Sequence, residues 1–121
     1  MQGNLPPEAQ EKIEELRQLQ GTAQELAIQK STAESQLNET EQALEQLEAI
    51  DADTEMYQEV GQLLIETDYE SAQTELEERQ SNLERRVEAL ERQEQRVEKQ
   101  FESLQEELQG LLGGIGDLTG A

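Results

Sequence analysis

Residues 55–67, EMYQEVGQLLIET, decide the fold because they separate two long runs of regular heptad spacing. Apolar side chains cluster in this stretch around Gly61, at Tyr57, Val60 and residues 63–65. A two-residue type II′ turn prefers glycine at its first central position. The stretch therefore predicts a β-hairpin over about residues 55–67 with its turn at Gly61. A plain helix-to-helix loop that carries some apolar residues is the alternative.

On both sides of this connector, apolar residues recur in alternating steps of three and four. Such spacing is the signature of a coiled-coil seam. It covers residues 16–47 before the connector and residues 76–111 after it. We therefore predict helices over about residues 7–50 and 69–112, followed by a flexible tail at 113–121. The seam positions are Leu16, Leu19, Ala23, Leu26, Lys30, Ala33, Leu37, Thr40, Leu44 and Leu47, then Leu76, Gln80, Leu83, Val87, Leu90, Glu94, Val97, Phe101, Leu104, Leu108 and Leu111.

Two arms of similar length around a short connector predict that the second helix returns antiparallel to the first. Leu16 is then expected near Leu104, and Leu47 near Ala72. The predicted fold class is mainly α, a long antiparallel two-helix coiled coil joined by a β-hairpin, in a single domain over residues 1–121. Both chain termini are expected at the end of the coiled coil that lies away from the hairpin.

The predicted hairpin needs partners. A two-stranded hairpin alone is marginally stable in water, and both of its edges are unpaired. Apolar residues on such edges favour the pairing of hairpins from several chains into a shared sheet or a closed oligomeric β-barrel. Oligomerisation is therefore predicted from the hairpin residues themselves.

The opposite end of the coiled coil is predicted to be adhesive. Residues 111–121 combine large aliphatic side chains with glycines, and Leu5 and Ile13 are expected beside them. Flexible apolar side chains at an exposed tip suit weak and promiscuous hydrophobic contacts. A frayed helix end without a function is the alternative.

The charge balance excludes several classes of partner. The 121 residues include 29 acidic and 9 basic ones, for a formal net charge of −20. Nucleic acids and anionic membrane surfaces are disfavoured, because both are bound through Lys and Arg. Self-repulsion destabilises such a chain in dilute buffer, whereas at about 1 M salt the screening length falls to about 3 Å. We interpret the acidity as adaptation to a cytosol of very high salt; an ordinary acidic coiled coil is the alternative.

No catalytic or cofactor chemistry is predicted. The chain has no Cys and no His, which removes thiol nucleophiles and most zinc sites. Asp51, Asp53 and Glu55 could hold a hard cation such as Mg²⁺, but a solvated charge cluster is the better interpretation. No apolar stretch approaches a membrane span, and the N-terminus has no secretory signal pattern. We expect a cytoplasmic protein that is not an enzyme.

Five segments together resemble the β subunit of archaeal prefoldin. They are QKS at 29–31, LNET at 37–40, ALEQL at 43–47, MYQEVGQLLI at 56–65 and LERQEQRV at 90–97, and a glycine-rich tail follows them. Heptads alone are weakly specific, whereas this connector in this position is highly specific. The sequence departs from the family in the methionine before the tyrosine and in its heavier acidic load.

The resemblance implies an ATP-independent chaperone of two α and four β subunits. In that family, hairpins build a double β-barrel, coiled coils capture unfolded proteins at their tips, and a group II chaperonin receives these clients. Carried onto this chain, the residues for assembly are Tyr57, Val60, Gly61, Leu63, Leu64 and Ile65. The residues for client contact are Leu5, Ile13, Leu16, Leu108, Leu111, Leu112 and Ile115.

Two other functions remain open from the sequence. A transcription-cleavage factor that inserts a coiled coil into RNA polymerase would use Asp51, Asp53 and Glu55 at its acidic tip, but such factors also resemble a coiled coil joined to a globular domain. A purely structural coiled-coil spacer would bind no client and leaves the apolar tail unexplained.

Overall fold

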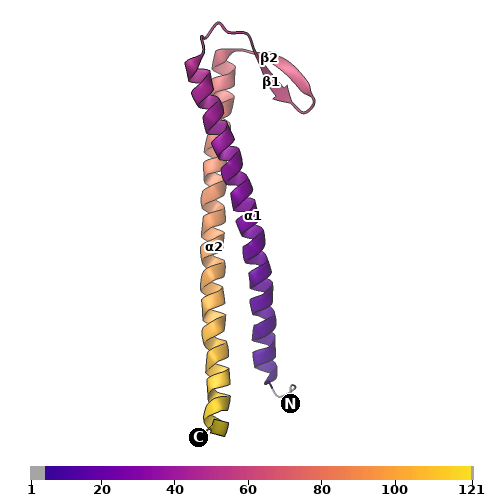
Figure 1. Ribbon diagram of the computed structural model, residues 1–121, viewed down its shortest axis with the longest axis vertical. Helices are drawn as coiled ribbons and strands as arrows, with labels where there is room; N and C mark the ends of the chain where they lie inside the picture. Colours follow the sequence, from indigo (N-terminus) through magenta and orange to yellow (C-terminus); the bar gives the residue numbers. More distant parts are fainter. Residues whose placement is uncertain (1–4, 121) are drawn as a thin grey trace. The chain divides into compact units, whose positions relative to one another are not determined.

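The computed structural model describes residues 5–120, with side chains for residues 5–113. The elements, in chain order, are α1 (Pro7–Ala49), β1 (Met56–Val60), β2 (Leu63–Thr67) and α2 (Tyr69–Gly120) (Figure 1). The predicted fold class is confirmed: the chain is mainly α, with two long helices joined by a β-hairpin. The sheet of a single chain has two strands, so a closed barrel requires the hairpins of other chains.

Helix α1 begins and ends close to the predicted residues. At its start the Gln10 amide donates to the Pro6 carbonyl over 3.1 Å, and the Gln10 side-chain amide donates to the Leu5 carbonyl over 3.2 Å. Proline is tolerated there because the first amides of a helix have no intrahelical acceptor. At the other end, the Thr54 amide donates to the Asp51 carbonyl over 3.0 Å and closes a turn beyond the helix.

Asp68 caps the start of helix α2. The carboxylate of Asp68 accepts a hydrogen bond from the Ser71 amide over 2.8 Å, and its carbonyl accepts one from the Ala72 amide over 2.9 Å. The hydrogen bonds from Ser71 favour the ionised carboxylate and lower the pKa of Asp68. This cap fixes the point at which the hairpin gives way to the second helix.

The hairpin has the predicted turn. Its strands pair antiparallel in a register that joins Met56 to Thr67 and Val60 to Leu63. Gly61 has a φ of +61°, and no other residue type in the described chain has positive φ. A type I′ turn would require positive φ at Gln62 as well, so the backbone fits the predicted type II′ turn. The plain-loop alternative is therefore wrong.

The chain forms two compact units, and each contains a part of both helices. The hairpin unit is Lys30–Ala89, and the chain-end unit is Met1–Gln29 with Leu90–Ala121. With the exception of Ala9, the buried side chains of both units lie at the predicted seam positions. In the hairpin unit Ala33, Thr40, Leu47 and Leu83 are buried. In the chain-end unit the seam residues Leu26 and Leu90 are buried, together with Ala9.

One buried seam residue is polar, and its hydroxyl has a hydrogen-bond partner. Thr40 is only 4% exposed, and its hydroxyl donates to the Gln36 carbonyl one turn earlier over 2.8 Å. A buried hydroxyl without a partner would destabilise the seam. The internal hydrogen bond lets threonine occupy this position without a partner on α2.

The prediction that helix 2 ends near residue 112 is wrong. Helix α2 continues to Gly120, so residues 113–120 are helical and not an irregular tail. The apolar steps of three and four persist through Leu111, Ile115 and Leu118, which is the helical pattern. Each glycine costs about 1 kcal/mol relative to alanine in a helix, a penalty that weakens a helix without forbidding it.

Candidate functional site

The hairpin of the hairpin unit presents apolar side chains on both of its faces. Since side chains alternate along a strand and paired residues share a face, Val60 and Leu63 lie on one face with Ile65. Tyr57 and Leu64 lie on the other face. Leu64 is 72% exposed, and the other four are exposed as well. The structure thus brings the predicted assembly residues together on one two-stranded sheet, around the turn at Gly61.

The base of the hairpin is held against α2 by a polar contact. The side-chain amide of Gln58 in β1 donates a hydrogen bond to the carboxylate of Glu75 in α2. A groove of about 560 Å³ lies between the hairpin base and the helices, with Leu47, Met56 and Leu76 among its lining residues. Neither Gln58 nor Glu75 was singled out by the sequence, because a polar tether carries no periodic signal.

Tyr57 adds a hydrogen-bonding hydroxyl group to the exposed hairpin. Its hydroxyl donates to the carboxylate of Glu55 over 2.6 Å, and this hydrogen bond raises the pKa of Tyr57 above its ordinary value. A tyrosine that combines an exposed ring with an oriented hydroxyl is a frequent interface residue. The exposed apolar residues of the hairpin would each contribute about 1.5–3 kcal/mol if a partner buried them fully.

The predicted client-contact residues belong to the chain-end unit. Leu5 is 38% exposed and Leu112 is 39% exposed. The other described members of the set are half-buried: Ile13, Leu16, Leu108 and Leu111. The side chain of Ile115 lies outside the described residues. The two helix ends are joined in this unit, because Lys12 of α1 forms an ion pair with Glu107 of α2 at 2.9 Å.

This ion pair occupies a position that continues the seam. Lys12 and Ala9 extend the steps of four and three backward from Leu16, so Lys12 stands where an apolar residue is expected. The hydrogen bond to Glu107 raises the pKa of Lys12. The heptad spacing, extended from Leu16 toward the N-terminus, identifies Lys12 as a seam position.

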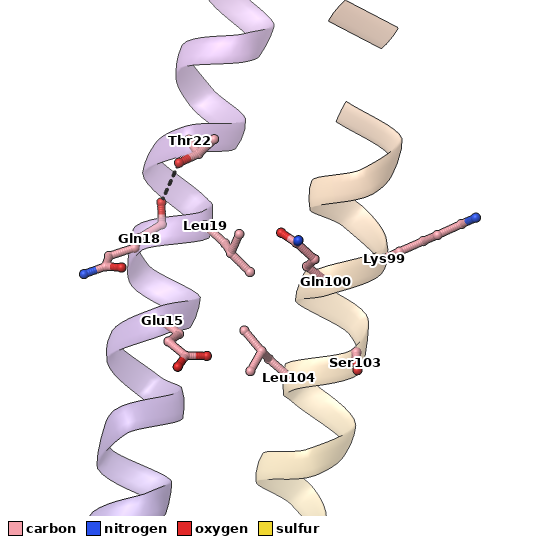
Figure 2. A pocket seen from close by; sticks show the side chains of 8 residues that line it. All are labelled: Glu15, Gln18, Leu19, Thr22, Lys99, Gln100, Ser103 and Leu104. Atoms are coloured by element: carbon pink, nitrogen blue, oxygen red, sulfur yellow. Dashed lines mark hydrogen bonds between the residues drawn. The ribbon is translucent and has the colours of Figure 1, made fainter. Parts of the chain in front are cut away.

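The seam of the chain-end unit is incompletely closed. Figure 2 shows Leu19 of α1 and Leu104 of α2 pointing toward one another across a groove of about 600 Å³. Polar side chains, among them Gln18 and Ser103, also line this groove. Both leucines are half-buried where a closed seam would bury them. The sequence identified Leu19 and Leu104 as seam residues and missed that they stay accessible.

The acidic residues of the connector are not gathered into a cluster. Among the residues that the structure describes, no three Asp, Glu, His or Cys side chains gather in a group able to hold a metal ion. This includes Asp51, Asp53 and Glu55, which the polymerase-factor alternative requires. In the same described part of the chain, neither helix is long and apolar enough to cross a bilayer.

Two long helices joined by an exposed two-stranded β-hairpin define a class of coiled-coil proteins. Within that class, the family model described as "Prefoldin subunit" matches residues 10–115. This match covers most of the sequence and includes the whole hairpin and most of both helices. The chain belongs to the prefoldin subunit family, which is a family of chaperones.

Curated relatives and a crystal structure agree with this assignment. The chain is 60% identical over 72 residues to prefoldin subunit beta of Halobacterium salinarum, and 66% identical over 72 residues to that of Natronomonas pharaonis. Each alignment covers 60% of this chain. It covers 58% of the length of the Halobacterium protein and 55% of the length of the Natronomonas protein. The prefoldin beta subunit of Thermococcus strain KS-1 superposes with a TM-score of 0.82 at 34% identity, over 91% of this chain and 96% of that one. The resemblance to the archaeal β subunit, in a halophile-type acidic variant, is confirmed.

Proposed function

We propose that this chain is a subunit of an ATP-independent cytoplasmic chaperone. It assembles with a prefoldin α subunit through its hairpin, in a complex of two α and four β chains. Its helix ends capture unfolded proteins, which then pass to a group II chaperonin. The apolar side chains that stay accessible in the chain-end unit carry this proposal.

The hairpin supports the assembly part of the proposal. Val60, Leu63 and Leu64 are exposed on a sheet of two strands, each of which has one unpaired edge. Addition of strands from other chains would satisfy the backbone groups of those edges and bury the apolar side chains. The Gln58–Glu75 tether holds the sheet to α2 before any partner binds.

The helix ends support the client-binding part. Leu5 and Leu112 are exposed. Farther along the two helices, the seam remains half-open at Leu19 and Leu104. One such contact is weak, but several arms acting on one client raise the avidity through effective concentration. The charge of −20 on each chain would keep client-loaded complexes soluble.

Truncation after Gln109 tests the proposal. The full chain and the truncated chain are each co-expressed with a prefoldin α subunit in about 2 M KCl, where charge repulsion is screened. The complexes are weighed by light scattering, and the aggregation of an unfolded test protein is followed. We expect complexes of the size of six subunits in both cases, and loss of aggregation suppression for the truncated chain. Suppression by neither complex would favour the structural spacer, which binds no client, and equal suppression by both would contradict capture at residues 110–121.

A further inference from the structure

A second groove lies in the chain-end unit and differs in charge from the one in Figure 2. It measures about 630 Å³, and its apolar lining consists of Ala23 from α1 with Val97 and Phe101 from α2. Glu98 and Glu102 line it as well. The groove in Figure 2 instead combines an acidic residue with Lys99.

Phe101 gives this groove a chemistry that the leucine-lined groove lacks. It is the single phenylalanine of the chain and is half-buried. The face of an aromatic ring attracts a cation within about 6 Å of its centre, and arginine is the most frequent cation there. Glu98 and Glu102 are four residues apart on one helix and are therefore neighbours on its surface.

We propose that this groove is a docking site for an apolar segment of a non-native protein that carries an arginine. The apolar residues of the segment pack on Ala23 and Val97, and the guanidinium lies over the ring of Phe101 between the carboxylates of Glu98 and Glu102. This occupant follows from complementarity: the apolar side chains of the groove match an apolar segment, and its carboxylates match the positive charge of an arginine. This inference rests on the proposed capture of unfolded proteins and adds a preference among them.

A matched control exists on the same helix. Glu84 and Glu88 occupy the same heptad positions as Glu98 and Glu102, two heptads earlier. Both are exposed, and the neighbouring seam residue Leu83 is buried, whereas Val97 is half-buried. A change at Glu84 and Glu88 alters the net charge by the same amount at a place where the seam is closed.

The test compares two fluorescein-labelled peptides of identical apolar sequence, one with a central arginine and one with glutamine in its place. Their Kd values for the assembled complex are measured by fluorescence polarisation. Three complexes are compared: unchanged, with E98Q and E102Q, and with E84Q and E88Q. A fourth complex carries Phe101→Leu, which removes the aromatic face and keeps an apolar side chain.

We expect the unchanged complex to bind the arginine peptide roughly fivefold or more tightly than the glutamine peptide. E98Q with E102Q, and Phe101→Leu, should abolish this preference, while E84Q with E88Q should retain it. Equal losses in the two double variants would overturn the inference in favour of the general acidic field. Equal binding of both peptides by the unchanged complex would overturn it while leaving client capture intact. Binding of neither peptide would overturn the proposed function and this inference together.

Discussion

The seam differs between two parts of α1, residues 26–47 and residues 16–23. From residue 26 to residue 47, every second seam position of α1 is buried: Leu26, Ala33, Thr40 and Leu47. Over residues 16–23 none of the seam positions is buried, although the heptad spacing is equally regular. The same spacing thus produces a closed seam in one region and an accessible one in the other. Under the proposed function, the closed region stabilises the coiled coil and the accessible region binds clients.

The largest effect is expected from a cavity in the closed region. Leu83→Ala removes a side chain that is 8% exposed and should destabilise the assembled complex by about 2–4 kcal/mol. Leu104→Ala removes a half-buried side chain and should cost about 1–2 kcal/mol. Thermal unfolding followed by circular dichroism in high salt compares the two variants. Similar losses of stability would mean that the two regions are equally closed.

The hairpin turn should show the next largest effect. Gly61→Ala places a side chain at a φ of +61° and should cost about 1–2 kcal/mol, with weaker assembly. Gly21→Ala is the control, because an added Cβ would meet nothing within 4 Å in the middle of α1. That variant should stabilise α1 by about 1 kcal/mol. Assembly is followed by light scattering and stability by thermal unfolding. Equal effects of the two substitutions on both would contradict the turn assignment.

The cap at Asp68 predicts a pH dependence. The pKa of Asp68 is lowered in the folded chain, so its contribution is complete above the ordinary value of 3.8 and disappears as the pH falls through the lowered pKa. Asp68→Ala should therefore lower the Tm by a few degrees at pH 7, and the difference should vanish in acid. Asp68→Asn keeps an acceptor and should lose less. A deficit that persists unchanged at low pH would exclude the cap as its cause.

The smallest effect is expected at the ion pair of the helix ends. Lys12→Gln removes the contact with Glu107, where both side chains are partly exposed and salt screens their attraction. The pKa of Lys12 is raised, so the pair contributes below the ordinary value of 10.5 and is lost as the pH rises through the higher one. We expect no change in Tm in high salt and a slight decrease in low salt. A decrease of the same size in high salt would point to packing of the lysine stem.

Much of the fold was predictable from local chemistry. The turn at Gly61 and the cap at Asp68 follow from short-range preferences, and the buried seam positions follow from the heptad period. The predicted end of α2 near residue 112 is wrong because the glycines weaken the helix without ending it, and the apolar steps continue through Leu118.

The sites were predictable only in part. The exposed hairpin residues, Leu5 and Leu112 were predictable because apolar side chains cluster there in the sequence, outside the regular part of the seam. The grooves at Leu19 and Phe101 depend on the separation of two helices, which a heptad pattern leaves undetermined. The Gln58–Glu75 tether is a single polar contact between distant residues, for which the sequence has no signal.

Hydrogen–deuterium exchange of the assembled complex, with and without a bound unfolded protein, tests the division of the seam most directly. Exchange reports the local opening of backbone amides, segment by segment. We predict that the client protects residues 9–23 and 97–112 and leaves residues 33–47 and 76–90 unchanged. Protection confined to residues 33–47 and 76–90 would contradict the assignment of client binding to the accessible seam.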